Sequence, residues 1–168
     1  MITPETAQFL IDYTAWASRL LVEAAGRLSP EELTRDFSTA DKSVLGTLAH
    51  IYGADRAWLA RVEGAPQSWL TESDYQLAVL QKEWPAVHMR WSQWARRLTG
   101  EALESDLAYT DLKGNPYRQP LWQVVMHVVN HGSHHRGQVS GFLRAMGHTP
   151  PGLDMTRYYR LGEPGRER

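Results

Sequence analysis

The sequence predicts an all-α fold, a four-helix bundle formed by one domain that spans residues 1–168. Three observations carry this prediction. Apolar residues recur at three- and four-residue steps along four long segments. No stretch has a convincing sheet pattern, and a long segment without helical period lies between the third and fourth helices. A chain of this length can also bury about 70% of the surface that its unfolded state exposes.

The composition is that of an ordinary soluble protein. Hydrophobic residues make up 42% and charged residues 22%, and the net charge is −1, from 18 basic and 19 acidic residues. No basic surface of the kind that binds nucleic acid is expected. No apolar run approaches the roughly 20 residues of a membrane span, and the amino terminus has no signal-peptide pattern, so a cytoplasmic location is the default expectation. The absence of cysteine excludes disulfides, thiolate metal sites and a cysteine nucleophile.

Residues 4–28 are expected to form the first helix. Pro4 suits the first turn of a helix, and Gly26 weakens the last. The apolar positions between them are Phe9, Leu10, Tyr13, Trp16, Ala17, Leu20, Leu21 and Ala24. Residues 31–41 are mixed and polar, which predicts a connection with turns near Asp36 and Ser38.

The second helix is expected to begin near Asp41 or Ser43 and to continue through Val62. Gly64-Ala65-Pro66 ends it. The third is expected from Ser73 or Asp74 to Leu98, with a kink or restart at Pro85. Three tryptophans at helical spacing in the third helix are more typical of a core or a dimer interface than of a ligand pocket: Trp84, Trp91 and Trp94.

Residues 100–119 lose the helical period. Residues 107–110 and 116–119 could form a short hairpin or an ordered loop. The fourth helix is expected from Leu121 to about Met146, where Gly147 ends it. Residues 153–159 could add one further turn, and residues 162–168 look like a frayed, charged tail.

Four of the seven histidines lie within nine residues of the fourth helix. His131 and His135 are four residues apart, so both could reach one metal ion from the same helix face. His127 lies one turn earlier on this face, and His134 is rotated about 100° away from His135. A zinc-type site takes three or four ligands, so a third must come from elsewhere in the chain.

His50 on the second helix is the candidate for that third ligand. Its neighbours on the same helix face are small: Gly46, Thr47, Gly53, Ala54 and Ala57. A stripe of small residues predicts that something approaches this face closely. Two interpretations remain: His50 is a hydrogen-bonded core residue within tight helix packing, or it is the missing ligand.

Several motifs together resemble those of the DinB/YfiT-like metalloenzymes. They are Trp16, the Ser43-Val-Leu-Gly-Thr-Leu-Ala-His50 segment, His131-x-x-x-His135-Arg-Gly-Gln138, and the ending Met146-Gly-His-Thr-Pro-Pro-Gly-Leu-Asp154. The resemblance covers nearly the whole chain. It implies an up-and-down four-helix bundle, commonly a homodimer, with a site for a divalent metal such as zinc or nickel. Carried over by motif, the metal ligands are His50, His131 and His135.

The family includes transferases and isomerases that use low-molecular-weight thiols, alongside many members without an assigned reaction. Three neutral imidazoles would leave a fourth position for water or substrate, as in catalytic zinc sites. The resemblance therefore implies a metal-dependent thiol transferase or a hydrolase, with a small-molecule substrate and, because the chain has no cysteine, any thiol supplied as a cosubstrate. The alternative is a non-catalytic metal-binding or stress-response binding protein.

Residues around the proposed ligands have weaker assignments. Gln138, one turn beyond His135, is the best candidate to hydrogen-bond a ligand, and His127 and His134 are expected in non-ligand roles. Asp55, Asp154 and Tyr13 could handle protons, but each is more typical of a surface or structural residue. Trp16, Trp58 and Trp122 could wall a pocket over the metal. Arg136 and Arg144 could hold an anionic substrate, but exposed helix arginines seldom have so specific a role.

Overall fold

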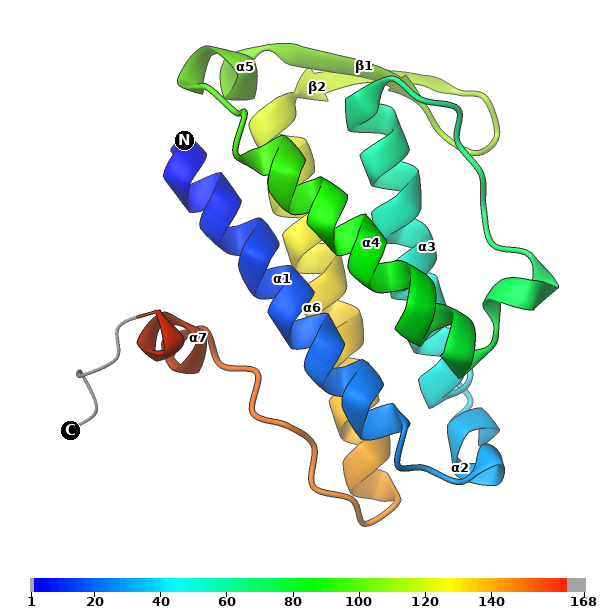
Figure 1. The fold of residues 1–168 in the computed structure, drawn as a ribbon. Helices are drawn as coiled ribbons and strands as arrows, with labels where there is room; N and C mark the ends of the chain where they lie inside the picture. Colours follow the sequence, from blue (N-terminus) through cyan, green and yellow to red (C-terminus); the bar gives the residue numbers. More distant parts are fainter. Residues whose placement is uncertain (1, 163–168) are drawn as a thin grey trace.

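The computed structural model describes residues 2–162 and has a bundle of four long helices. They are α1 (Pro4–Ala25), α3 (Val44–Glu63), α4 (Leu77–Ala95) and α6 (Leu121–Ala145) (Figure 1). Helices α1 and α3 each pack against both α4 and α6, so the four helices surround one core. The predicted all-α four-helix bundle is confirmed.

The helix directions follow from the connections. Helix α3 runs beside α4 in the same direction, because Tyr52 contacts Trp84 near the middle of both helices and Glu63 pairs with Arg90 further along both. Residues 64–76 therefore return along the outside of the bundle (Figure 1). The chain reverses direction at the other two long connections, α1 to α3 and α4 to α6. The helices therefore do not alternate strictly up and down as predicted, because the connection between α3 and α4 is long enough to return to the same end of the bundle.

The long connection before α6 contains the predicted hairpin. Strands β1 (Asp106–Thr110) and β2 (Pro116–Pro120) pair antiparallel, with Asp106 opposite Pro120 and Tyr109 opposite Tyr117. In Figure 1 this hairpin lies across the end of the bundle where α3 ends and α6 begins. It is consequently adjacent to the histidine-rich first half of α6.

Two short helices occur where the sequence suggested none. Helix α2 (Pro30–Thr34) has a capping box between Ser29 and Glu32, and in α5 (Gly100–Glu104) the Thr99 side chain accepts from the Ala102 N–H. Such elements are set by their caps and are too short to show an apolar period. Helix α7 (Met155–Leu161) replaces the predicted single turn.

The predicted helix ends differ from the structure in three places, one of which is the end of α4, at Ala95 rather than Leu98. Helix α1 ends at Ala25 rather than near residue 28, and α4 begins at Leu77 because η1 (Glu72–Asp74) is a separate 3₁₀ turn. Pro85 lies inside α4 without dividing it. The predicted start of α3 is accurate, since Ser43 caps it by accepting from the Gly46 N–H. Gly64 ends α3 with a φ of 65°, a conformation that favours glycine.

Tryptophans supply much of the core. Trp84, Trp91 and Trp94 are buried, with exposed fractions of 1%, 3% and 9%, which places them in the core of the chain itself. Helix α7 packs its aromatic residues on the first half of α1, where Phe9 stacks on Tyr159 with ring centroids 4.2 Å apart. The predicted tail lies outside the described residues, apart from Gly162.

Candidate metal centre

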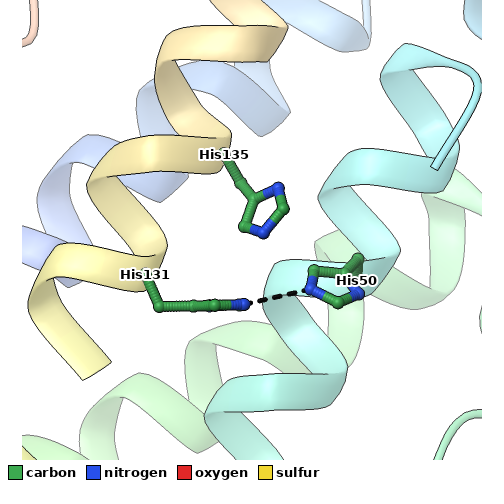
Figure 2. Close-up of side chains that lie close together, drawn as sticks. All are labelled: His50, His131 and His135. Carbon is green, nitrogen blue, oxygen red and sulfur yellow. Dashed lines mark hydrogen bonds between the residues drawn. The ribbon is translucent and has the colours of Figure 1, made fainter. Parts of the chain in front are cut away.

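Helices α3 and α6 bring His50, His131 and His135 together. Each offers a ring nitrogen, and the three atoms all lie within 4.8 Å of one another. The Nε2 atoms of His50 and His131 are 3.0 Å apart. Two ligands of one tetrahedral zinc ion would be separated by about 3.3 Å, given zinc–nitrogen bonds of about 2.05 Å. Figure 2 shows the three rings converging from the two helices.

The small residues around His50 allow two loops to approach it. A Cβ atom at Gly46 would lie 2.0 Å from the backbone oxygen of Asp41, and one at Gly53 would lie 2.7 Å from the Leu70 side chain. The sequence therefore predicted the close approach correctly. The approaching groups are the loop before α3 and the loop before η1, which brings Trp69 edge-on to the His50 ring at 6.0 Å.

The Nδ1 atoms of two histidines face oxygen atoms. His135 Nδ1 is 2.7 Å from Gln138 Oε1, so the N–H at Nδ1 donates to the amide oxygen. Asp41 lies between both rings, with Oδ1 3.5 Å from His50 Nδ1 and Oδ2 3.6 Å from His135 Nδ1. A proton held at Nδ1 leaves the Nε2 lone pair free to bind a metal.

The same arrangement disfavours protonated imidazoles. Burial, followed by the neighbouring His135 and His50, lowers the pKa of His131 from 6.5 to about 4. Burial also lowers the pKa of His50, although the Asp41 carboxylate acts in the opposite direction. Both rings are therefore neutral at pH 7, which is the state that binds a metal.

Among residues 2–162, no fourth side chain joins the group of converging ligand atoms. The His50 side chain retains 28% of its exposure and that of His135 retains 13%, so solvent reaches the cluster. Asp41 is the nearest carboxylate described, and it faces the Nδ1 atoms rather than the Nε2 atoms. This donor set fits an ion that keeps at least one position for a non-protein ligand.

His127 and His134 lie beside the cluster. The exposed His127 ring packs edge-on to Trp58 at 5.1 Å and stays 5.8 Å from the His131 ring. Burial of its ring nitrogens and the charge of Arg61 lower the pKa of His127. His134 is exposed, with its ring 4.9 Å from that of His135. Their expected non-ligand roles stay predictions.

Other residues singled out in the sequence lie elsewhere. Asp55 accepts from the Trp84 indole on the side of α3 that faces α4, and the Tyr13 hydroxyl donates to the Leu153 carbonyl. Asp154 caps α7. The three tryptophans suggested as pocket walls lie in different places. Trp58 lies beside His127, whereas Trp16 packs against Tyr158 and Trp122 packs against the core.

Two residues were missed or misjudged by sequence reasoning. Asp41 was considered only as a possible start of the second helix, yet it approaches two of the three histidines. Arg136 was taken as an exposed helix residue, but only 1% of its surface is exposed.

A family model described as the DinB family matches residues 1–166. The chain belongs to the DinB family. A relative, "Protein DinB" of Bacillus subtilis (strain 168), is 24% identical over 156 residues, which cover 89% of this chain and 91% of the relative. The crystal structure of a DinB-like protein from Bacillus cereus ATCC 10987 matches with a TM-score of 0.59 and 22% identity, covering 82% of this chain and 90% of that one. This likeness supports the fold.

Among residues 2–162, the helices are too short or too polar to cross a membrane.

Proposed function

We propose that this DinB family member is a metal-dependent enzyme whose divalent ion, such as zinc or nickel, is held by His50, His131 and His135. The convergence of three neutral imidazoles, with no fourth ligand among the described residues, supports this proposal most strongly. A structural zinc site would instead be closed by four protein groups.

The chain's own residues would orient the ligands and receive the substrate. Gln138 and Asp41 keep the Nδ1 protons in place, so the Nε2 atoms of His135 and His50 face the ion. Trp69 borders the cluster and is 38% exposed, so its ring is available to pack on a substrate. A bound divalent ion supplies Lewis-acid chemistry, which polarises a substrate group and lowers its pKa.

Two reaction classes fit the proposed site, a thiol transfer and a hydrolysis. The chain contains no cysteine, so a thiol transferase reaction would require a low-molecular-weight thiol as cosubstrate. Hydrolysis of a small-molecule substrate would use water in its place. Family membership favours the thiol reaction, because the DinB/YfiT-like family includes enzymes that use low-molecular-weight thiols.

Cobalt substitution tests the open position directly. The visible spectrum of the cobalt protein should change when azide or a small thiol is added, because the added molecule enters the coordination sphere. His127→Ala is the critical variant, since His127 lies one turn before His131 on α6 with its ring 5.8 Å from the His131 ring; it should retain the metal and the spectral response. If the spectrum does not change when ligands are added, and His127→Ala loses the metal, the site is closed by a fourth protein ligand.

Turnover separates the enzyme from a non-catalytic protein. The metal-loaded chain should be assayed with glutathione, bacillithiol or mycothiol and an electrophile, and with ester and amide substrates. Activity that disappears on chelation and returns with metal supports the enzyme. Tight metal binding without turnover favours the alternative, a metal-binding or stress-response binding protein.

We also propose that the chain forms a homodimer, as the family resemblance implies. A two-fold interface formed by helix faces is the commonest arrangement for such bundles. Sedimentation at micromolar concentrations should show a species of twice the 19.1 kDa chain mass. A monomer throughout that range would contradict the proposal.

A further inference from the structure

Arg136 follows the metal-binding candidate His135 on α6 but faces another helix. Its guanidinium Nη2 donates to Ser133 Oγ at 3.0 Å and its Nη1 donates more weakly to Ser18 Oγ on α1 at 3.4 Å. The guanidinium carbon lies 5.6 Å from the Tyr13 ring centroid. The side chain is buried, with a 1% exposed fraction.

Within the described part of the chain, this buried charge has no direct counter-ion. Among residues 2–162, no carboxylate oxygen lies within 4.0 Å of the guanidinium. The buried Asp55 attracts Arg136 from a greater distance, but its Oδ2 accepts from Trp84. Buried arginines are ordinarily paired with an anion, because burial of an unpaired charge is costly.

The backbone makes room for the guanidinium. A Cβ atom at Gly132, one turn before Arg136, would lie 2.6 Å from Nη1. A glycine at this position therefore permits the side chain to lie along its own helix. The arginine is held in one place, as a recognition residue requires.

A polar cleft of about 410 Å³ adjoins Arg136. Its walls are α1, α6 and residues 151–155, and α6 contributes Ser133, Arg136, Gly137, Ser140 and Arg144. The Tyr13 hydroxyl holds the third wall in place by donating to the Leu153 carbonyl at 2.8 Å. The charged residues of this lining are Arg136, Arg144 and Asp154, so the cleft carries a net positive charge.

Hydrogen-bond donors remain available in the cleft. Ser133 Oγ accepts from Arg136, so its own proton can be given to a ligand. The guanidinium of Arg136 has five N–H groups, of which two are used by the serine contacts. The planar fork of arginine matches the oxygen atoms of carboxylates and phosphates.

We propose that this cleft binds a small oxyanion group, a carboxylate or a phosphate, as the counter-ion of Arg136. Arg144 and the hydroxyl groups of Ser133 and Ser140 supply further contacts. The site is separate from the metal centre, because His135 faces α3 and Arg136 faces α1. It requires no metal.

The test uses the metal-free full-length chain at constant ionic strength. Inorganic phosphate and acetate are titrated separately, with chloride as the reference, while calorimetry measures binding and thermal unfolding measures the midpoint. At least one oxyanion should bind saturably, with a Kd in roughly the millimolar range, and raise the midpoint. The oxyanion that binds more tightly, phosphate or acetate, shows whether the cleft prefers a phosphate or a carboxylate group.

Three variants assign the binding to the cleft. Arg136→Met should abolish it, and Arg144→Gln should weaken it about tenfold. Gly137→Leu should block it sterically without disturbing the fold, because no atom lies within 4 Å of a Cβ built at Gly137. Arg97→Gln is the matched control: Arg97 is exposed and does not line the cleft, so this variant should bind as the wild type does.

Two results would overturn the proposal. One is the absence of saturable binding by either oxyanion. The other is binding that survives Gly137→Leu and Arg144→Gln unchanged, which would mean an adventitious ion only. These two variants change exposed positions, so they decide the question even if Arg136→Met fails to fold.

Discussion

Two polar clusters inside the bundle can be compared, one with the single histidine His88 and one with three histidines, and they differ in the partners that their polar atoms meet. On the α3–α4 side, Asp55 Oδ2 accepts from Trp84 Nε1 at 2.8 Å and the Asp55 carbonyl accepts from Trp91 Nε1 at 3.0 Å. His88 Nε2 lies 3.6 Å from the same carboxylate. Two indole donors of the chain thus meet Asp55 in this closed cluster, while His88 Nε2 has no hydrogen-bond partner among the described residues.

On the α3–α6 side, three imidazoles face one another instead. The 3.0 Å contact between His50 and His131 joins two Nε2 atoms, and among residues 2–162 no carboxylate joins the three converging ring nitrogens. Asp41 and Gln138 approach only the outer Nδ1 atoms. The comparison teaches that a histidine beside indoles and a carboxylate belongs to the packing that stabilises the fold. Histidine ring nitrogens whose lone pairs converge on one point are instead suited to binding an ion from outside the chain.

The largest expected effect on stability is in the closed cluster. Asp55→Ala should lower the free energy of unfolding by about 3 kcal/mol, because the Trp84 N–H would be buried without an acceptor. Urea unfolding of the metal-free chain measures this loss. Asp55→Asn retains an acceptor and should lose less than half as much. Metal affinity should stay within about threefold of the wild type in both variants; a larger change would mean that the two clusters act as one.

The second effect concerns pH. The pKa of His131 is lowered from 6.5 to about 4 in the folded chain, so in that interval the unfolded state binds a proton that the folded state does not. The stabilisation is present above pH 6.5 and is lost as the pH falls toward 4. The loss should be about 2 kcal/mol in metal-free protein, after allowance for partial solvent access.

His131→Asn isolates this contribution, because the amide does not titrate. Urea unfolding at several pH values should show a shallower decline for the variant than for the wild type between pH 6.5 and 4. Parallel declines would show that the His131 ring is not held neutral by its surroundings.

The smallest effect tests Asp41, which lies beside two of the three proposed ligands. Asp41→Asn should weaken metal binding about tenfold and leave its stoichiometry unchanged, because the carboxylate charge beside the two Nδ1 atoms makes both rings better ligands. Changes to such outer partners typically cost 10–100-fold in affinity. Asp36→Asn is the matched control in the same loop, since the Asp36 carboxylate accepts only from the Ser38 N–H among the described residues. Equal affinities in the two variants would remove Asp41 from the site.

Much of this contrast was accessible from the sequence. The period of apolar residues predicted the four long helices, and the four-residue spacing predicted that His131 and His135 share a face. The glycines at positions 46 and 53 predicted a close approach to His50. The identity of the approaching group, Asp41, was not predictable because it depends on the path of a loop without regular period.

Arg136 could have been recognised as buried. It lies on a stripe that repeats every three or four residues and is buried throughout: Val125, Val129, Gly132, Arg136, Val139 and Leu143. The neighbouring glycine in this stripe was a further signal, because it leaves space for a long side chain. The short helices α2 and α5 offered no comparable period.

Metal titration of the histidine variants tests the central claim most directly. Metal-free wild-type protein, titrated with zinc or nickel, should bind one ion per chain. His50→Ala, His131→Ala and His135→Ala should each weaken binding at least about 100-fold, because each removes one of three ligands. His148→Ala, whose imidazole instead pairs with Glu32 at 2.8 Å, should bind as the wild type does. Stoichiometric and equally tight binding by His50→Ala would contradict the account.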